Sequence, residues 1–255
     1  MPSVVCKRIW PKYVPNSEGY FVSWRDLLNW PESVAKHQSI RLNEQLFHAF
    51  DTNRNIASYE FVVFDTELTG LNRQKDEIVS IAAVRIRNTR ILLADSFHSY
   101  VRTRKKLLGE GTFIHRITPQ QILLAPGPEE VLPEFVKFCH SSVLVGHLPA
   151  LDFSFLNKAL KRNTGGLIRN PCLDSMELAR HWHRLQKKNA AESVPKIRSF
   201  NLNELAVAYR VPLFPSHDAL GDALQTACLF LFLMEKLRKC GLSTLKDFQK
   251  VGRLR

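Results

Sequence analysis

The sequence lacks any long apolar run and any closely spaced pair of cysteines, and each absence excludes a class of protein. Its five cysteines are scattered, odd in number and never in CxxC spacing, which is typical of a reduced protein without a structural zinc site. The start of the chain has no apolar core of an export signal. The longest apolar stretch, residues 227–234, is far shorter than the roughly 20 residues that cross a bilayer. We therefore expect a cytoplasmic protein with no membrane association.

Acidic residues are few relative to basic ones. Lys and Arg number 36 against 24 Asp and Glu, which gives a formal charge of +12. Such a surface attracts polyanions such as nucleic acid, and charge that only solubilises the chain is an equal alternative. Hydrophobic residues make up 45% and charged residues 24% of the 255-residue chain. This balance predicts a globular protein with one main domain and an appendage.

Three parts are predicted along the chain. Residues 1–58 are rich in Trp and Pro and show no strand-like alternation, which predicts a helical N-terminal appendage. Within it, Pro31 suits the first turn of a helix that continues toward Phe50. Residues 59–240 form the predicted main domain, and residues 241–255 a basic C-terminal tail.

The main domain begins with strand patterns and ends with helix patterns. Short apolar runs predict strands at residues 59–65, 78–86, 91–101, 142–146 and 172–173. The first has an unbroken apolar run from Phe61 to Phe64, which predicts a central position in the sheet. Helical spacing predicts helices at residues 128–140, 152–162, 175–185, 201–209 and 219–239. This order predicts an α/β fold in which helices flank a mixed sheet.

Two carboxylates close the first predicted strand, in the segment DTELTG. Because side chains alternate between faces, Asp65 and Glu67 project from the same side of the sheet. Two anions held so close repel each other unless a cation lies between them. A solvated pair at a strand end is the alternative interpretation. The apolar run before the pair disfavours it, because the acids then lie at the carboxyl end of a buried strand, where open α/β folds place their sites.

Two further segments carry acids and histidines. His147 follows the fourth predicted strand and Asp152 begins a helix, where a lone Asp is more often an N-cap than a ligand. His217 precedes the last helix and Asp222 lies in its first turns, while Asp218 competes for the capping role. Each segment is a weak signal alone, and the three together predict one acidic cleft.

At these positions the chain resembles the DEDD exonucleases, in their histidine-containing, DnaQ-like branch, and is similar to the epsilon proofreading subunit of bacterial DNA polymerase III. The family's three motifs are matched in order by Asp65, Glu67, Thr69 and Gly70, by Gly146, His147 and Asp152, and by His217, Ala219, Asp222 and Ala223. One departure is Leu148, where relatives commonly have Asn. The resemblance implies an RNase H-like fold with a mixed five-stranded sheet.

The resemblance also implies a 3′→5′ exonuclease that hydrolyses phosphodiester bonds at the 3′ end of a single strand and releases 5′-mononucleotides. Two divalent cations, Mg²⁺ or Mn²⁺, are the implied cofactors, and hard oxygen ligands suit both ions. The implied metal ligands are Asp65, Glu67, Asp152 and Asp222. His217 is the implied general base, because an imidazole can accept a proton at neutral pH.

The pocket for the terminal nucleotide is expected to involve Thr66, Leu68, His147 and Phe153, although Phe153 could equally belong to the core. DNA is the favoured substrate, and a polymerase or repair complex is the expected setting. Two alternatives stay open: an exoribonuclease that trims RNA, and a non-catalytic nuclease-fold subunit of a polymerase assembly. The presence of all four acids disfavours the second.

Overall fold

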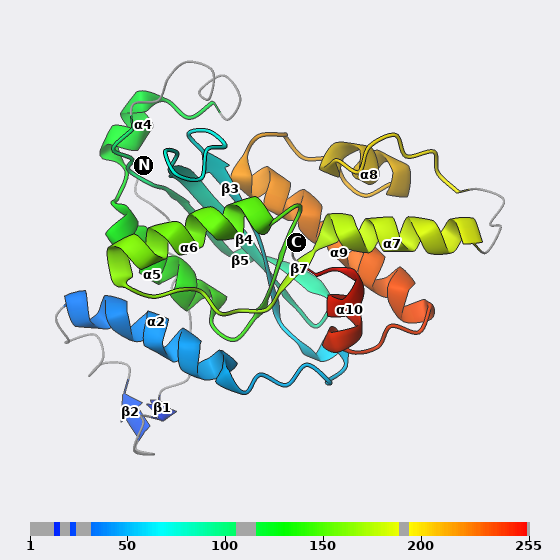
Figure 1. Ribbon diagram of the computed structural model, residues 1–255, viewed down its shortest axis with the longest axis horizontal. Coiled ribbons are helices and arrows are strands. Elements are labelled where there is room, and N and C mark those ends of the chain that lie inside the picture. The colour runs from blue at the N-terminus through cyan, green and yellow to red at the C-terminus, as the bar shows by residue number, and fades with distance from the viewer. Residues whose placement is uncertain (1–12, 16–20, 24–31, 106–115, 189–193, 254–255) are drawn as a thin grey trace.

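The computed structural model describes residues 13–15, 21–23, 32–105, 116–188 and 194–253 (Figure 1). A five-stranded mixed sheet with the strand order β5-β4-β3-β6-β7 forms its centre. The strands are β3 (Phe61–Leu68), β4 (Ile78–Arg87), β5 (Arg90–Tyr100), β6 (Val143–Gly146) and β7 (Cys172–Asp174). β4 pairs antiparallel with β3 and β5, whereas β6 runs parallel to β3 and β7. The predicted mixed five-stranded sheet and the central place of the first strand are confirmed.

Helices cover both faces of the sheet. One face packs against α9 (Ala219–Lys239), together with α7 (Ser175–Lys188) and α8 (Leu202–Tyr209). The other packs against α5 (Pro128–Cys139) and α6 (Ala150–Thr164), and α4 (Pro119–Leu124) packs against Val79 of β4 and Tyr100 of β5. On β3, Phe61 and Val63 belong to the α9 side of the core, and Val62 and Phe64 to the α6 side. Burial on both faces therefore explains the continuous apolar run.

The N-terminal part differs from the all-helical prediction. Its long helix is α2 (Glu32–His48), but β1 (Tyr13–Pro15) and β2 (Phe21–Ser23) form an antiparallel pair ahead of it. Pro31 lies outside the described residues. The buried Asn43 side chain fastens α2 to the main domain, because it donates a 2.5 Å hydrogen bond to Asn170 and accepts one of 2.8 Å from the Arg169 backbone. A short 3₁₀ turn (Ile56–Ser58) then leads into the sheet.

The predicted basic tail contains a helix, α10 (Leu245–Val251), that packs into the domain. Leu245 and Phe248 are fully buried in the α9-side core. The backbone N–H of Asp174 donates a 2.9 Å hydrogen bond to the Gly252 carbonyl, so the chain after α10 lies along the outer edge of β7. The prediction followed the net charge of the segment and missed a three-residue apolar spacing, formed by Leu242, Leu245, Phe248 and Val251.

Candidate metal centre and active site

The acidic side chains meet at the carboxyl end of β3. Asp65 and Glu67 continue the face of β3 that carries Phe61 and Val63, so they point toward the α9 side. Asp222, in the first turn of α9, faces them from that helix layer. One carboxylate oxygen from each of Asp65, Glu67 and Asp222 lies within 4.8 Å of the other two. The strand and the helix thus bring two of the predicted motifs into one cluster.

Asp152 reaches the same place from the other face of the sheet. It lies in the first turn of α6, and its carboxylate accepts a short hydrogen bond from the Thr66 hydroxyl. Thr66 is only 8% exposed and points to the α6 side, because it alternates with Asp65 along β3. Thr66 was predicted to line the nucleotide pocket. In the structure it orients a predicted metal ligand.

The protonation behaviour of these acids reflects their crowding. Burial, followed by the charges of Asp152 and Glu67, raises the pKa of Asp65 well above its usual range. Burial and the charge of Asp222 raise the pKa of Glu67 to about 7. Burial also raises the pKa of Asp152 to about 6 and raises that of Asp222. Buried like charges of this kind are stabilised by a cation. An all-carboxylate donor set therefore fits a hard divalent ion such as Mg²⁺ or Mn²⁺.

His217 sits at the rim of this cluster. It has a φ of 61°, and its backbone N–H donates a 3.1 Å hydrogen bond to the Asp222 carboxylate. His217 is exposed to solvent. The predicted base and the predicted third-motif acid are therefore neighbours in space.

His147 has both ring nitrogens occupied within the protein. Nε2 donates to the Phe200 carbonyl at 2.9 Å, because a carbonyl can only accept, and Nδ1 then accepts from the Ser175 hydroxyl at 2.9 Å. Burial lowers the pKa of His147 to about 4, which agrees with a neutral ring. His147 was predicted to contact the substrate. In the structure, its ring joins β6 to the start of α7 and to the loop before α8.

The two apolar residues predicted for the pocket have core contacts. Leu68 and Phe153 both pack against the α6-side core, and the Phe153 ring lies edge-on to Phe64 with a centroid separation of 6.4 Å. Phe153 is only partly buried and also lines a cavity beside β7. Phe153 was predicted to line a pocket or to belong to the core. Its ring does part of each, since it packs on the core and the residue also lines the cavity.

Near the acids, Asp218 has a second effect besides its predicted capping role, and His98 was missed. Asp218, predicted only as a cap, does cap α9 by accepting a 3.2 Å hydrogen bond from the Gly221 N–H, and its charge also contributes to the raised pKa of Asp65 and Glu67. His98 on β5 is aligned with Asp65 through Ala82 on β4 and shares its face. The order of the motifs along the chain does not predict this alignment, because the alignment depends on how β3, β4 and β5 pair.

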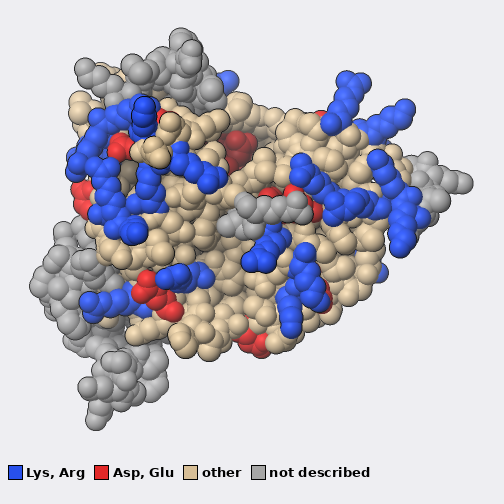
Figure 2. Space-filling view, viewed as in Figure 1, with Lys and Arg blue, Asp and Glu red and all other residues tan. Residues whose placement is uncertain are grey.

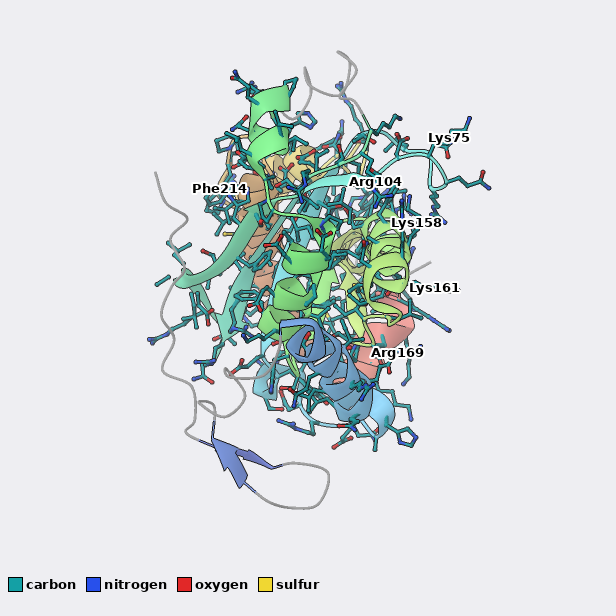
Figure 3. The ribbon with its side chains drawn as sticks, turned by 90° about the vertical axis from the view of Figure 1, so that its left-hand side faces the viewer. Lys75, Arg104, Lys158, Lys161, Arg169 and Phe214 are labelled. Carbon is teal, nitrogen blue, oxygen red and sulfur yellow. The ribbon has the colours of Figure 1, made fainter. Side chains whose placement is uncertain are left out.

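Basic side chains lie on the same face as the hollow that holds acidic side chains (Figure 2). Figure 2 shows Lys and Arg spread over one face of the molecule, with acidic side chains recessed in a hollow over the start of α9. Figure 3 shows Lys75, Lys158, Lys161 and Arg169 spaced from top to bottom along one side. One cation of this region is already paired, since Lys105 contacts the buried Asp76 carboxylate. Within the described residues, no helix is long and apolar enough to cross a membrane.

A family model described as an exonuclease matches residues 62–230, which is more than half of the chain. The chain belongs to this exonuclease family. The predicted resemblance to DnaQ-like DEDD exonucleases is thereby confirmed, and the chain is assigned to hydrolytic nucleases. Divalent-metal dependence is consistent with the family and with the cluster of Asp65, Glu67 and Asp222.

The curated relatives include much longer proteins. The chain is 34% identical over 192 residues to a DNA polymerase III PolC-type from Caldanaerobacter subterraneus, and 30% identical over 199 residues to one from Staphylococcus haemolyticus. These alignments cover 75% and 78% of the chain but only 13% of each relative. The chain therefore spans a small part of the length of the relatives it matches.

The solved structures that match support the fold. The zinc-bound form of an E. coli exonuclease I complex with single-stranded DNA matches with a TM-score of 0.63 at 16% identity, over 76% of this chain and 43% of that one. The cell-death related nuclease CRN-4 matches with a TM-score of 0.58 at 15% identity, over 69% of this chain and 64% of that one. These similarities confirm the exonuclease-type fold inferred from the sequence.

Proposed function

We propose that the chain is a 3′→5′ exonuclease that hydrolyses the terminal phosphodiester bond of a single strand and releases 5′-mononucleotides. The observation that carries this proposal is the convergence of Asp65, Glu67 and Asp222 within 4.8 Å in a chain of the exonuclease family. A cluster of partly buried carboxylates of this kind repels a phosphodiester unless cations are bound. The carboxylates therefore need bound cations before a phosphodiester can approach them.

Two divalent cations, Mg²⁺ or Mn²⁺, would neutralise the charge that develops on the attacking and leaving oxygens. Asp65, Glu67, Asp152 and Asp222 would hold them. Thr66 keeps the Asp152 carboxylate oriented through its hydroxyl group. In this proposal, His217 accepts the proton of the attacking water through its exposed ring, and its backbone N–H orients Asp222.

Single-stranded DNA is the proposed substrate, and a polymerase or repair complex in the cytoplasm is the proposed setting. The support comes from relatives: the E. coli exonuclease I structures include complexes with dT13 and dA16 oligonucleotides, and the curated relatives are DNA polymerases. Leu148 is 51% exposed beside the site, where an apolar side chain can contact a base or sugar of either nucleic acid.

The test uses matched DNA and RNA oligonucleotides of one sequence, each labelled at the 5′ end, with Mg²⁺ or Mn²⁺. We expect a ladder that shortens one nucleotide at a time, faster for DNA, with 5′-mononucleotides as the product. Asp65→Asn removes one charge from the cluster at constant size and is expected to abolish the ladder. A ladder from wild type and Asp65→Asn at equal rates would overturn the proposal, and faster RNA degradation would transfer it to an exoribonuclease.

A further inference from the structure

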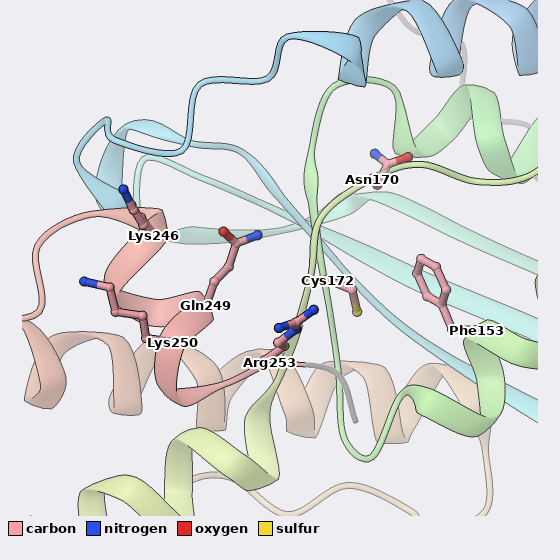
Figure 4. Close-up of a pocket in the computed structure, with 7 residues that line it drawn as sticks. All are labelled: Phe153, Asn170, Cys172, Lys246, Gln249, Lys250 and Arg253. Carbon is pink, nitrogen blue, oxygen red and sulfur yellow. The ribbon is translucent and has the colours of Figure 1, made fainter.

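A cavity of about 710 Å³ lies along the outer edge of β7. It extends to Phe153 at the start of α6, the helix that also carries Asp152. Its volume falls within the roughly 300–1,000 Å³ that is usual for ligand sites. Figure 4 shows Lys246, Gln249 and Lys250 projecting from α10 on one side and Phe153 from α6 on the other, with Cys172 between them. We refer to this cavity as the basic trough. Its described lining residues include three cations and no acid.

The cations of the basic trough are largely uncompensated. Among the described residues, neither Lys246 nor Arg253 has an ion-pair partner, and Lys250 pairs with Asp247 at 3.1 Å, where 65% of the Lys250 side chain stays exposed. Neighbouring positive charges without counterions repel one another and attract an anion. A ligand with several negative charges would relieve this repulsion.

The element that carries these cations is firmly anchored. Leu245 and Phe248 bury the inner face of α10, and the Lys246 backbone N–H donates a 2.8 Å hydrogen bond to the Thr52 carbonyl. After the helix, Gly252 is hydrogen-bonded to Asp174 on β7. The backbone positions that carry the charged side chains are thus set before any ligand binds, which lowers the entropic cost of binding.

The inner end of the basic trough adjoins the acidic cluster. Phe153 directly follows Asp152 at the start of α6. The Cys172 thiol lies between the two ends, and burial, followed by the charges of Asp174 and Asp152, raises its pKa well above the usual range. Asp152 itself accepts a hydrogen bond from Thr66, which stands between Asp65 and Glu67 on β3, so the Phe153 end of the trough lies next to a predicted metal ligand. A chain-like ligand could occupy both places at once.

We propose that the basic trough binds the phosphodiester backbone of the single strand whose 3′ end lies at Asp65, Glu67 and Asp152. The inference rests on the proposed function for the position of that end. A strand carries one negative charge per nucleotide, so Lys246, Lys250 and Arg253 are suited to successive phosphates. Phe153 offers a partly exposed ring to a sugar or base at the inner end. The trough would make activity depend on strand length.

The test compares the double variant Lys246→Gln/Lys250→Gln with the control Lys236→Gln/Lys239→Gln. The control removes two lysines from the last turns of α9, where Lys236 lies over Phe232 and Lys239 pairs with Glu235. Both pairs keep good helix formers and change the charge equally. Affinity for a fluorescent long oligothymidylate is measured by anisotropy in EDTA over a range of salt concentrations.

We expect the trough variant to bind roughly tenfold more weakly than wild type, and its log–log salt slope to fall by about 1.4, at about 0.7 for each lost phosphate contact. The control variant should bind like wild type. In cleavage assays, the trough variant should raise KM for the long strand and leave KM for a thymidine dinucleotide unchanged, because the dinucleotide is too short to reach the trough.

Equal affinity of the trough and control variants for the long strand would overturn the inference. An equal rise in KM for the dinucleotide would overturn it as well, because the lysines would then act on the cluster itself. The binding assay needs no catalysis. A chain that binds strands through the trough but cleaves none would therefore reject the proposed function while supporting the trough.

Discussion

The backbone N–H of His217 lies 3.1 Å from the carboxylate of Asp222 and donates a hydrogen bond to it. The bond exists because His217 adopts a φ of 61°, a left-handed conformation that costs a residue with a Cβ roughly 1–2 kcal/mol. Position 217 is therefore constrained in two ways: its backbone orients a candidate metal ligand, and its ring stays exposed, as the proposed role of general base requires.

Two substitutions at this position separate the roles of backbone and ring. Asn tolerates the left-handed region better than Ala does, so His217→Asn should retain the loop and the bond to Asp222. Both His217→Asn and His217→Ala should lose roughly 10²–10⁴-fold in kcat, because both lack the general base. Thermal unfolding and Mn²⁺ titration should show His217→Asn closer to wild type than His217→Ala. If His217→Asn has the wild-type kcat, the ring is not the base.

The Thr66 hydroxyl gives a second prediction, because its hydrogen bond orients Asp152. Thr66→Val keeps the shape of the side chain and removes the donor. Partners of metal ligands typically contribute about 10–100-fold to metal affinity, so calorimetry should show Mn²⁺ binding weakened by that factor. Thr66→Ser restores the donor and should restore the affinity. Equal weakening in both variants would indicate a packing effect instead.

The acidic cluster of the metal-free protein should destabilise the fold less as the pH falls. Burial and neighbouring carboxylates raise the pKa of Glu67 to about 7, and burial raises that of Asp152 to about 6. An acid with a raised pKa binds more protons folded than unfolded, so its contribution is complete below the unfolded value near about 4 and is lost as the pH rises through the folded value. Chemical unfolding in EDTA should show this contribution as a gain on the order of 1–2 kcal/mol for wild type relative to Glu67→Gln between about pH 7 and about pH 4. The comparison cancels the opposite effect of the lowered pKa of His147.

Mg²⁺ should reverse this trend. Bound cations favour the charged carboxylates, so the ion should stabilise the protein most above about pH 7, where the metal-free cluster is least stable. Glu67→Gln is the matched control, since it removes the carboxyl group whose pKa is raised to about 7 and should lack this pH-dependent contribution in EDTA. A pH profile identical to wild type in this variant would show that other groups govern the transition.

Sequence patterns predicted those features that depend on local order. Helix α9 begins at Ala219 and ends at Lys239, as its spacing indicates, and the apolar run of β3 marks the centre of the sheet. Pairings between distant segments were not predictable. The contact of Thr66 with Asp152 joins residues 86 positions apart, and the bond of His147 to the Phe200 carbonyl joins residues 53 apart. Such contacts depend on which strands and helices become neighbours.

The C-terminal segment shows the same limit and gives the last prediction. Its charge predicted a tail, yet Phe248 is 0% exposed within the α9-side core. Phe248→Ala should therefore cost about 3–5 kcal/mol of unfolding free energy, because it removes a ring from a packed core and leaves a cavity.

The neighbouring Gln249→Ala is the control. Gln249 points into the basic trough and Ala is a good helix former, so this variant should unfold within about 0.5 kcal/mol of wild type. Urea unfolding of both variants decides between a helix that belongs to the domain and a tail that only rests on it. If Phe248→Ala unfolds at the wild-type urea concentration, residues 241–255 contribute nothing to the core. Helix α10 would then also fail to provide the fixed support that the lysines of the basic trough require.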